Sequence, residues 1–421
     1  MQITNNLTSW LEDSKESDFP IQNIPFGIAS TKDTAARPFS RIGDHGIDLA
    51  AMADHGFFDN LEIDDLNVFY QDTLNDFISL GKPTTNKVRE RIAELFSKDN
   101  IELNDNVEAK KAIIFSVDEL IMAMPVHVGD YTDFYSSIEH ATNVGMMFRD
   151  PDKALLPNWK HIPVGYHGRS SSIVISGTPI HRPYGQTKKN DEELPSYGAS
   201  RLVDFELEMG FVLGKQTQLG EQIPIDNAED HIFGLVIFND LSARDIQKWE
   251  YVPLGPFLGK SFGSVISPWI VTMEALSQFK VKGPVQEPKV LPYLEHDGKH
   301  NLDVELEVHI NTGKSMNKVC HSNMKYLYWS MAQQLTHHAV NGCNMNVGDM
   351  CASGTISGPT EDSYGSMLEL AWKGTKPLKM QDGSERTFIQ DNDTVIMKAY
   401  AQNDEVRIGF GDVSCKILAA K

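Results

Sequence analysis

One apolar run, residues 232–238, constrains the fold more strongly than any other stretch of the chain. Its sequence, IFGLVIF, contains no charged side chain and predicts a buried strand. The run ends in Asn239-Asp240, where a rigid strand end can project a carboxylate into a cleft. This strand therefore predicts both part of a buried sheet and the position of a functional site.

Cationic and amide side chains follow this strand closely. A helical segment with Ser242 as its N-cap would place Arg244 and Gln247 on one face. A loop rich in Pro and Gly, residues 252–263, then carries Lys260. A carboxylate, a guanidinium, an amide and an ammonium in one stretch predict a site where a metal and an anionic substrate meet. A purely structural loop could also contain Gly, Pro and Lys.

Length and charge limit the class of protein. A chain of 421 residues predicts two domains, which we place at residues 1–118 and 119–421. The net charge of −20 argues against nucleic acid or an anionic membrane as the main partner. No apolar run reaches the length of a membrane span. Four cysteines without metal-site spacing and a polar, acidic N-terminal segment predict a cytoplasmic protein with reduced thiols.

The two parts differ in their patterns. Residues 1–118 show short strand-like runs and a helix over 87–96 without a cluster of polar residues, which indicates packing or assembly. Beyond residue 119, β-like runs predict a sandwich or barrel-like domain with long functional loops, at residues 172–176, 205–213, 232–238, 304–310 and 394–399. One helix is expected to begin at Ser322, with an apolar stripe that reaches Leu335.

Four carboxylates form a candidate metal site. Glu206 and Glu208 would share one face of a strand, and Asp133 and Asp240 complete the set. A solvated acidic edge is the plain alternative in so acidic a chain. Carboxylates on one face repel one another unless a cation neutralises them, and hard oxygen ligands suit Ca²⁺ or Mg²⁺ better than Zn²⁺.

Two further stretches carry groups for proton transfer and ligand contact. The sequence GDYTDFYSSIEH contains Tyr135 and His140, and Arg149 follows shortly afterwards. In ASGTISG, glycines flank hydroxyl side chains, so backbone N–H groups could approach a ligand oxygen, although a plain turn would look the same. Glu369 alternates with two leucines, points away from them and could orient a histidine.

Long motifs in a fixed order resemble the fumarylacetoacetase family over nearly the whole chain: GDYTDFYSS, HATNVG, PVGYHGR, SARDIQ, WEYVPLGPFLGKSFG, ASGTISG and GSMLEL. The resemblance implies a mainly β protein with an N-terminal SH3-like barrel and a C-terminal mixed β-sandwich or roll, assembled as a homodimer. It also implies metal-dependent hydrolysis of the carbon–carbon bond of 4-fumarylacetoacetate, a small anionic diketo acid. The products would be fumarate and acetoacetate, in the last step of tyrosine and phenylalanine breakdown.

The resemblance also assigns roles to individual residues. It implies Ca²⁺ held by Asp133, Glu206, Glu208 and Asp240, and Mg²⁺ near Asp240, Lys260 and Ser264. The Lys260 ammonium cannot be a ligand, so its backbone or an indirect role must be meant. His140 would be the catalytic base held by Glu369, and the oxyanion-stabilising set would be Arg244, Gln247 and Lys260. Substrate contacts are implied for Tyr135, Arg149, Tyr166, Gln247, Tyr251 and Thr355.

Two positions depart from the pattern of animal members of the family. Ser264 stands where Thr is expected and keeps the hydroxyl, and Leu241 stands where Trp is expected. Two other functions remain open. One is a diketo-acid decarboxylase, hydratase or isomerase with the same carboxylate site, and the other is a non-catalytic Ca²⁺-binding protein. His140 favours the hydrolase, because hydrolysis needs a base that activates water.

Overall fold

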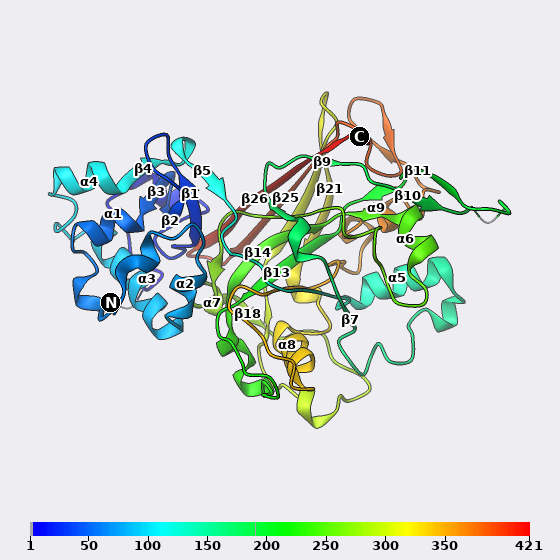
Figure 1. Ribbon diagram of the computed structural model, residues 1–421, viewed down its shortest axis with the longest axis horizontal. Coiled ribbons are helices and arrows are strands. Elements are labelled where there is room, and N and C mark those ends of the chain that lie inside the picture. Colours follow the sequence, from blue (N-terminus) through cyan, green and yellow to red (C-terminus); the bar gives the residue numbers. More distant parts are fainter. Residues whose placement is uncertain (1–2, 190) are drawn as a thin grey trace.

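The computed structural model describes residues 3–189 and 191–421, which form a smaller N-terminal part and a larger C-terminal part (Figure 1). A five-stranded barrel-like sheet organises the N-terminal part, in the order β4 (Ile114–Ser116), β3 (His45–Asp48), β2 (Arg37–Ile42), β1 (Phe26–Ser30) and β5 (Ile121–Ala123). The turn between β2 and β3 needs Gly43, whose φ of 58° lies in the left-handed region. Strand β5 lies beyond residue 118, the expected end of this domain.

Short helices surround this sheet: α1 (Leu49–Asp54), α2 (Asn75–Ser79), α3 (Lys82–Phe96) and α4 (Val107–Ile113). Helix α3 contains the helix expected over 87–96 but begins earlier, with a proline in its first turn. Its buried face includes Val88, Ile92 and Phe96, which are four residues apart along the helix.

Two large sheets form the C-terminal part. The first has eight strands: β7 (Gly165–His167), β6 (Tyr131–Phe134), β22 (Met350–Ala352), β13 (Leu207–Leu213), β14 (Ile232–Asp240), β16 (Ser264–Ile266), β8 (Ile173–Ile175) and β17 (Val271–Thr272), which pairs with β14. The second has five: β21 (Met316–Asn323), β20 (Glu305–Asn311), β25 (Thr394–Gln402), β26 (Arg407–Leu418) and β9 (Ile180–His181). One hydrophobic core joins the two sheets, as in the expected mixed sandwich.

Smaller elements complete the C-terminal part. The two-stranded ribbons are β10 (Tyr184–Thr187) with β11 (Ser196–Ala199), β12 (Val203–Asp204) with β15 (Ser242–Ala243), β18 (Lys280–Val281) with β19 (Asn301–Leu302), and β23 (Leu378–Lys379) with β24 (Glu385–Arg386). The helices are α5 (Ile138–Phe148), α6 (Arg244–Glu250), α7 (Met273–Leu276), α8 (Met331–Ala339) and α9 (Met367–Leu370).

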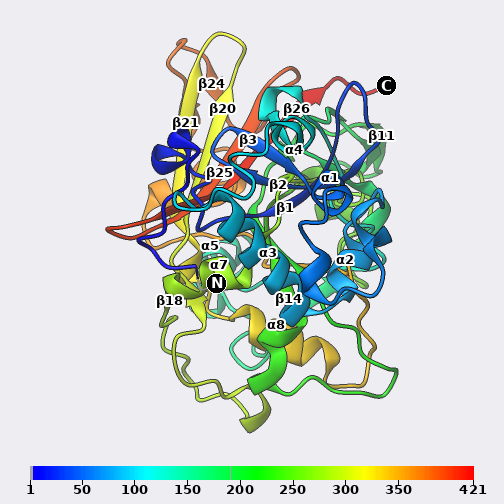
Figure 2. The ribbon, with the colours of Figure 1, turned by 90° about the vertical axis from the view of Figure 1, so that its left-hand side faces the viewer.

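The N-terminal part packs on one face of the eight-stranded sheet, and Figure 2 shows its helices in front of that sheet. Alternate residues of β14 point to opposite faces. Leu235 and Ile237 belong to the sandwich core, whereas Val236 and Phe238 pack with the N-terminal part. The apolar run is therefore buried on both faces, which explains its lack of polar residues.

Two helix starts expected from the sequence are wrong. Ser322 belongs to strand β21, and α8 begins after Ser330, whose hydroxyl accepts the Gln333 N–H in a capping box. Ser242 belongs to the short strand β15, and α6 begins at Arg244 after a residue that makes no side-chain cap. In both cases the serine pairs with a neighbouring strand, Ser322 with Leu306 of β20 and Ser242 with Asp204 of β12. The extended backbone of the strand therefore continues through the serine, and the helix begins later.

No helix in the described part of the chain combines the length and the apolar character needed to cross a membrane.

Candidate functional site

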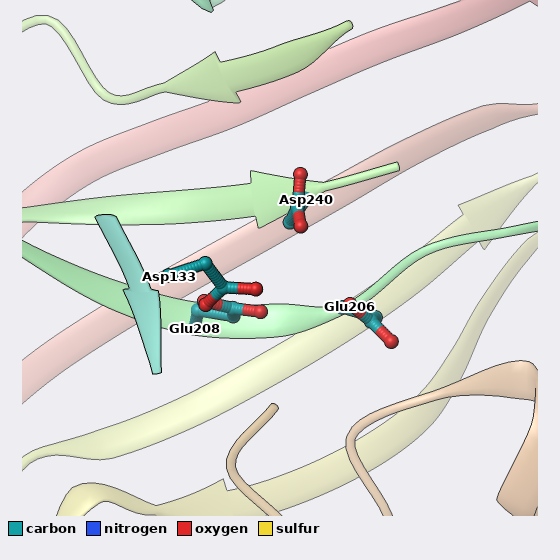
Figure 3. Close-up of side chains that lie close together, drawn as sticks. All are labelled: Asp133, Glu206, Glu208 and Asp240. Atoms are coloured by element: carbon teal, nitrogen blue, oxygen red, sulfur yellow. The ribbon is translucent and has the colours of Figure 1, made fainter. Parts of the chain in front are cut away.

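Four buried carboxylates converge where strands of the eight-stranded sheet end (Figure 3). Asp133 comes from β6, Asp240 ends β14, Glu208 lies in β13, and Glu206 lies just before that strand. One oxygen from each residue can be chosen such that all lie within 4.8 Å of one another. The structure thus brings together the four carboxylates expected from the sequence.

Sheet register explains this convergence. Glu208 faces Phe238 across the β13–β14 pair, so Asp240, two residues beyond Phe238, lies diagonally across from Glu208 on the same face. On the other side, Asp133 pairs with Ala352 of β22, which connects β6 to β13. Rigid strands therefore fix three of the four carboxylates.

Two buried cations lie against this cluster. The Lys260 ammonium pairs with Glu206 and lies 2.5 Å from Asp240 Oδ2. Arg244 lies 2.6 Å from Glu206 Oε1 and 2.8 Å from Asp204 Oδ2. Burial raises the pKa of Glu206, but Arg244, Lys260 and His140 outweigh it and lower the pKa to about 2. Glu206 is therefore an ionised carboxylate at neutral pH.

Asp133 and Glu208 form no ion pair with a cation of the described residues, and their pKa values are raised, whereas that of Glu206 is lowered. Burial, followed by the charges of neighbouring carboxylates, raises the pKa of Asp133 and of Glu208 well above the ordinary value. Asp133 Oδ1 and Glu208 Oε1 are buried without a hydrogen-bond partner among the described residues. Unpaired hard oxygens that repel one another fit a divalent cation, which would supply the missing charge and the missing contacts.

Two hydroxyls surround Asp240. Ser264 Oγ donates to Asp240 Oδ1 at 2.7 Å, and the Tyr166 hydroxyl lies 3.5 Å from Asp240 Oδ2. A serine at position 264 therefore reaches the carboxylate directly. Leu241, the other departure from the family pattern, is fully buried in the sandwich core.

A buried histidine–glutamate pair lies beside the cluster. His140 Nδ1 is 2.7 Å from Glu369 Oε2, and the two residues are 3% and 1% exposed. His140 is held in α5, whose N-cap Ser137 accepts the His140 backbone N–H. Glu369 lies in the short helix α9. The bond at Nδ1 leaves Nε2 of the same ring to act on a ligand.

Three more of the residues expected at the site lie close to the groups already described. Tyr135 packs edge-on against His140, with ring centroids 5.3 Å apart. Thr355 is buried, and it follows Gly354, whose backbone N–H donates to Glu208 Oε2 at 3.0 Å. Gln247 Oε1 accepts from Arg244 Nη1 at 3.4 Å.

Two expected substrate contacts are exposed instead. Tyr251 is 52% exposed after α6, and Arg149 ends α5 with its guanidinium bonded to the carbonyl of Ala154. Arg149 nevertheless affects Tyr135, a residue of the site. Burial and the charges of Glu369 and Glu206 raise the pKa of Tyr135, whereas the charges of Arg244 and Arg149 lower it. Arg149 is therefore within electrostatic reach of the site without being bonded to the cluster.

Several supporting residues were missed from the sequence. Ser366 Oγ and Ser357 Oγ donate to Glu369 Oε2 at 2.8 and 2.9 Å, and Asn143 Nδ2 donates to Glu369 Oε1 at 2.9 Å. The spacing of Ser366 and Glu369 is that of a helix-capping box and could have indicated this contact. Asn143 is far from Glu369 in sequence, and the glycine-flanked hydroxyls of ASGTISG, which include Ser357, suggested ligand contacts and not a bond to Glu369.

Two models of known protein families match most of the chain. The model described as "Fumarylacetoacetate (FAA) hydrolase C-terminal" matches residues 131–417, and "Fumarylacetoacetase N-terminal" matches residues 22–125. The chain belongs to the fumarylacetoacetase family. The expected family and the fold class, an N-terminal barrel with a C-terminal mixed β-sandwich, are thereby confirmed.

Curated members of this family are similar along their whole length. Fumarylacetoacetase of Dictyostelium discoideum is 53% identical over 421 residues, which cover 98% of both chains. The human enzyme is 52% identical over 416 residues, covering 98% of this chain and 99% of its own. A solved fumarylacetoacetate hydrolase from Exiguobacterium antarcticum shares the fold, with 18% identity, a TM-score of 0.53, and coverage of 94% and 99% of the two chains.

Proposed function

We propose that this protein is a metal-dependent hydrolase that splits 4-fumarylacetoacetate and water into fumarate and acetoacetate. This reaction would be the last step of tyrosine and phenylalanine breakdown. The observation that carries the proposal is the buried His140–Glu369 pair beside a four-carboxylate cluster, in a chain similar over its whole length to fumarylacetoacetases. A base, a metal site and buried cations are the groups that hydrolysis of a diketo acid requires.

His140 is the base of the proposed reaction. Glu369 holds the proton on Nδ1, so Nε2 is free to take a proton from water. The water oxygen then attacks the ketone carbon attached to the double bond, because that carbon becomes the new carboxylate of fumarate. Glu369, itself bonded to two serines and an asparagine, stabilises the imidazolium that this proton transfer creates.

Arg244, Gln247 and Lys260 stabilise the tetrahedral oxyanion in this mechanism. Arg244 is held by two carboxylates, so its position does not depend on the substrate. The Gln247 carbonyl faces Arg244, which leaves its amide N–H groups to donate to the oxyanion. When the oxyanion collapses, the carbon–carbon bond breaks, and the leaving enolate carbon takes the proton from His140. Each donor to such an oxyanion is typically worth about 2.7–4 kcal/mol.

The cation belongs to the proposal as well. Asp133, Glu206, Glu208 and Asp240 would hold Ca²⁺, and Mg²⁺ would lie near Asp240, Ser264 and the backbone of Lys260. A bound cation would act as a Lewis acid for the two ketone oxygens of the substrate. Tyr135, Arg149, Tyr166, Tyr251 and Thr355, together with Gln247, would contact the substrate.

The organisation of the protein is proposed in the same way. We place the domains at residues 1–118 and 119–421, with β5 of the second segment returning to pair with β1 of the N-terminal sheet. We also place the protein in the cytoplasm, as a homodimer. Val252, Leu254 and Phe257 are 67%, 95% and 67% exposed, which supports an interface on the loop after α6.

The decisive test is loss of 4-fumarylacetoacetate absorbance with purified protein, with and without a chelator, while fumarate and acetoacetate are assayed. Equal amounts of both products, formed only with metal, are expected. Release of CO₂, or hydration without cleavage, would instead assign the protein to a decarboxylase or hydratase. Bound Ca²⁺ without turnover would leave a non-catalytic Ca²⁺-binding protein.

His140→Ala supplies the matching variant. We expect it to lose turnover while its thermal stability and Ca²⁺ binding stay close to those of the wild type. A variant that loses the cation as well would count against His140 as the base.

A further inference from the structure

Asp204 is a buried carboxylate that connects two parts of the candidate site. It ends strand β12, whose pairing with β15 places it opposite Ser242, and it is 0% exposed. Both of its oxygens are used. Oδ2 accepts from Arg244 Nε at 2.8 Å and from the Leu368 N–H at 3.1 Å, and Oδ1 accepts from the Met367 N–H at 2.7 Å.

These bonds lead to two separate catalytic groups. On one side Asp204 holds Arg244, the proposed oxyanion donor. On the other side it holds the first backbone N–H groups of α9, the helix that carries Glu369. Glu369 in turn lies 2.7 Å from His140. One side chain therefore links the proposed oxyanion donor to the helix that carries the partner of the proposed base.

We propose that Asp204 is a positioning residue that keeps Arg244 in register with the His140–Glu369 pair during hydrolysis. The inference rests on the proposed function. Both oxygens of Asp204 are already bonded to Arg244 and to the N–H groups of α9, so its effect must pass through the groups it holds. A base and an oxyanion donor act on the same carbon in one step, and a misplacement of about 1 Å typically costs about a hundredfold in rate.

A purely structural role is the competing explanation, since any buried carboxylate that binds an arginine and backbone N–H groups contributes to stability. Asp393 provides a matched control. It is 1% exposed, binds Arg386 through both oxygens at 2.7 and 2.9 Å, and accepts the Gln390 N–H at 2.9 Å. Its partners lie outside the candidate site, so its loss should affect stability alone.

The experiment compares Asp204→Asn with Asp393→Asn in the full-length protein. We expect both variants to lose thermal stability. Only Asp204→Asn should lower kcat, by about a hundredfold, with a KM within threefold of the wild type. If Asp204→Asn does not fold, Asp204→Ser replaces it, because serine keeps an oxygen for the helix N–H groups but offers no charge to Arg244.

A double-mutant cycle with Arg244→Lys separates positioning from general weakening. If Asp204 acts through Arg244, adding Asp204→Asn to Arg244→Lys should lower kcat by less than threefold further. Fully additive effects, or a kcat of Asp204→Asn equal to that of Asp393→Asn, would overturn the inference while leaving the proposed function intact. A wild-type protein without turnover would overturn both.

Discussion

Glu369→Gln is the substitution that most directly tests the proposed base. The change keeps the size of the side chain and removes its charge. Glu369 Oε2 now accepts hydrogen bonds from His140, Ser357 and Ser366, at 2.7, 2.9 and 2.8 Å. An amide at this position cannot compensate the positive charge that His140 gains when it takes a proton from water.

The expected loss follows from that one bond. A hydrogen bond to a charged group contributes about 1.5–3 kcal/mol, and the bond to the Glu369 carboxylate strengthens once His140 is protonated and both partners carry charge. Since about 1.4 kcal/mol corresponds to a factor of ten in rate, kcat should fall by about 10- to 150-fold. KM should change little, because Glu369 is buried and both of its oxygens are already bonded to protein groups.

The assay is steady-state hydrolysis of 4-fumarylacetoacetate, with thermal unfolding measured on the same preparations. Glu307→Gln is the matched control, because Glu307 Oε2 lies 3.0 Å from His309 Nε2 in β20, outside the candidate site. Glu307→Gln should retain the wild-type kcat. A Glu369→Gln variant with kcat within twofold of the wild type would refute the reasoning, and a raised KM alone would assign Glu369 to substrate binding.

Three further predictions concern the metal, the core and acid stability. Glu206→Ala should weaken Ca²⁺ binding at least tenfold in calorimetry, and unchanged affinity would remove Glu206 from the ligand set. Phe233→Ala should cost about 3–5 kcal/mol in denaturant unfolding, because the buried ring packs against both Phe26 and Phe77, with centroids 6.1 and 6.4 Å away. A loss below about 1 kcal/mol would contradict this. Burial raises the pKa of Glu369, but His140 and other partners outweigh it and lower that pKa below the ordinary 4.5. The ionised form of Glu369 therefore stabilises the fold above about pH 4.5, and this stabilisation is lost as the pH falls further. The difference in Tm between wild type and Glu369→Gln should narrow below that pH, and a difference that widens would contradict the lowered pKa of Glu369.

Local patterns predicted the strand and the carboxylates well. The apolar run ending at Asp240 is strand β14, and the i, i+2 spacing of Glu206 and Glu208 does place both in the cluster. These predictions hold because a strand fixes the direction of its own side chains, and the bridge of Glu206 to Ser366 continues the extended backbone just before β13.

Predictions that depended on distant partners were less complete. The stripe from Met324 to Leu335 has helical spacing, yet it covers a short 3-10 turn and, further along, the start of α8. Between them the backbone of Leu327 bridges to Ser137, a contact that no local pattern contains. The same limit applies to Asp204, whose partners lie 40 and more residues away along the chain.

The shared core of the two parts has a consequence for synthesis of the chain. Residues of the N-terminal sheet, such as Ile28, pack with Phe238 and Met350, which a ribosome adds only after most of the chain has been made. At roughly 5–20 residues per second, the N-terminal sheet waits on the order of ten seconds or longer for these partners. During that interval its apolar face is uncovered. Nascent chains that end before β22 should therefore bind chaperones and be cleaved by proteases more readily than the completed protein.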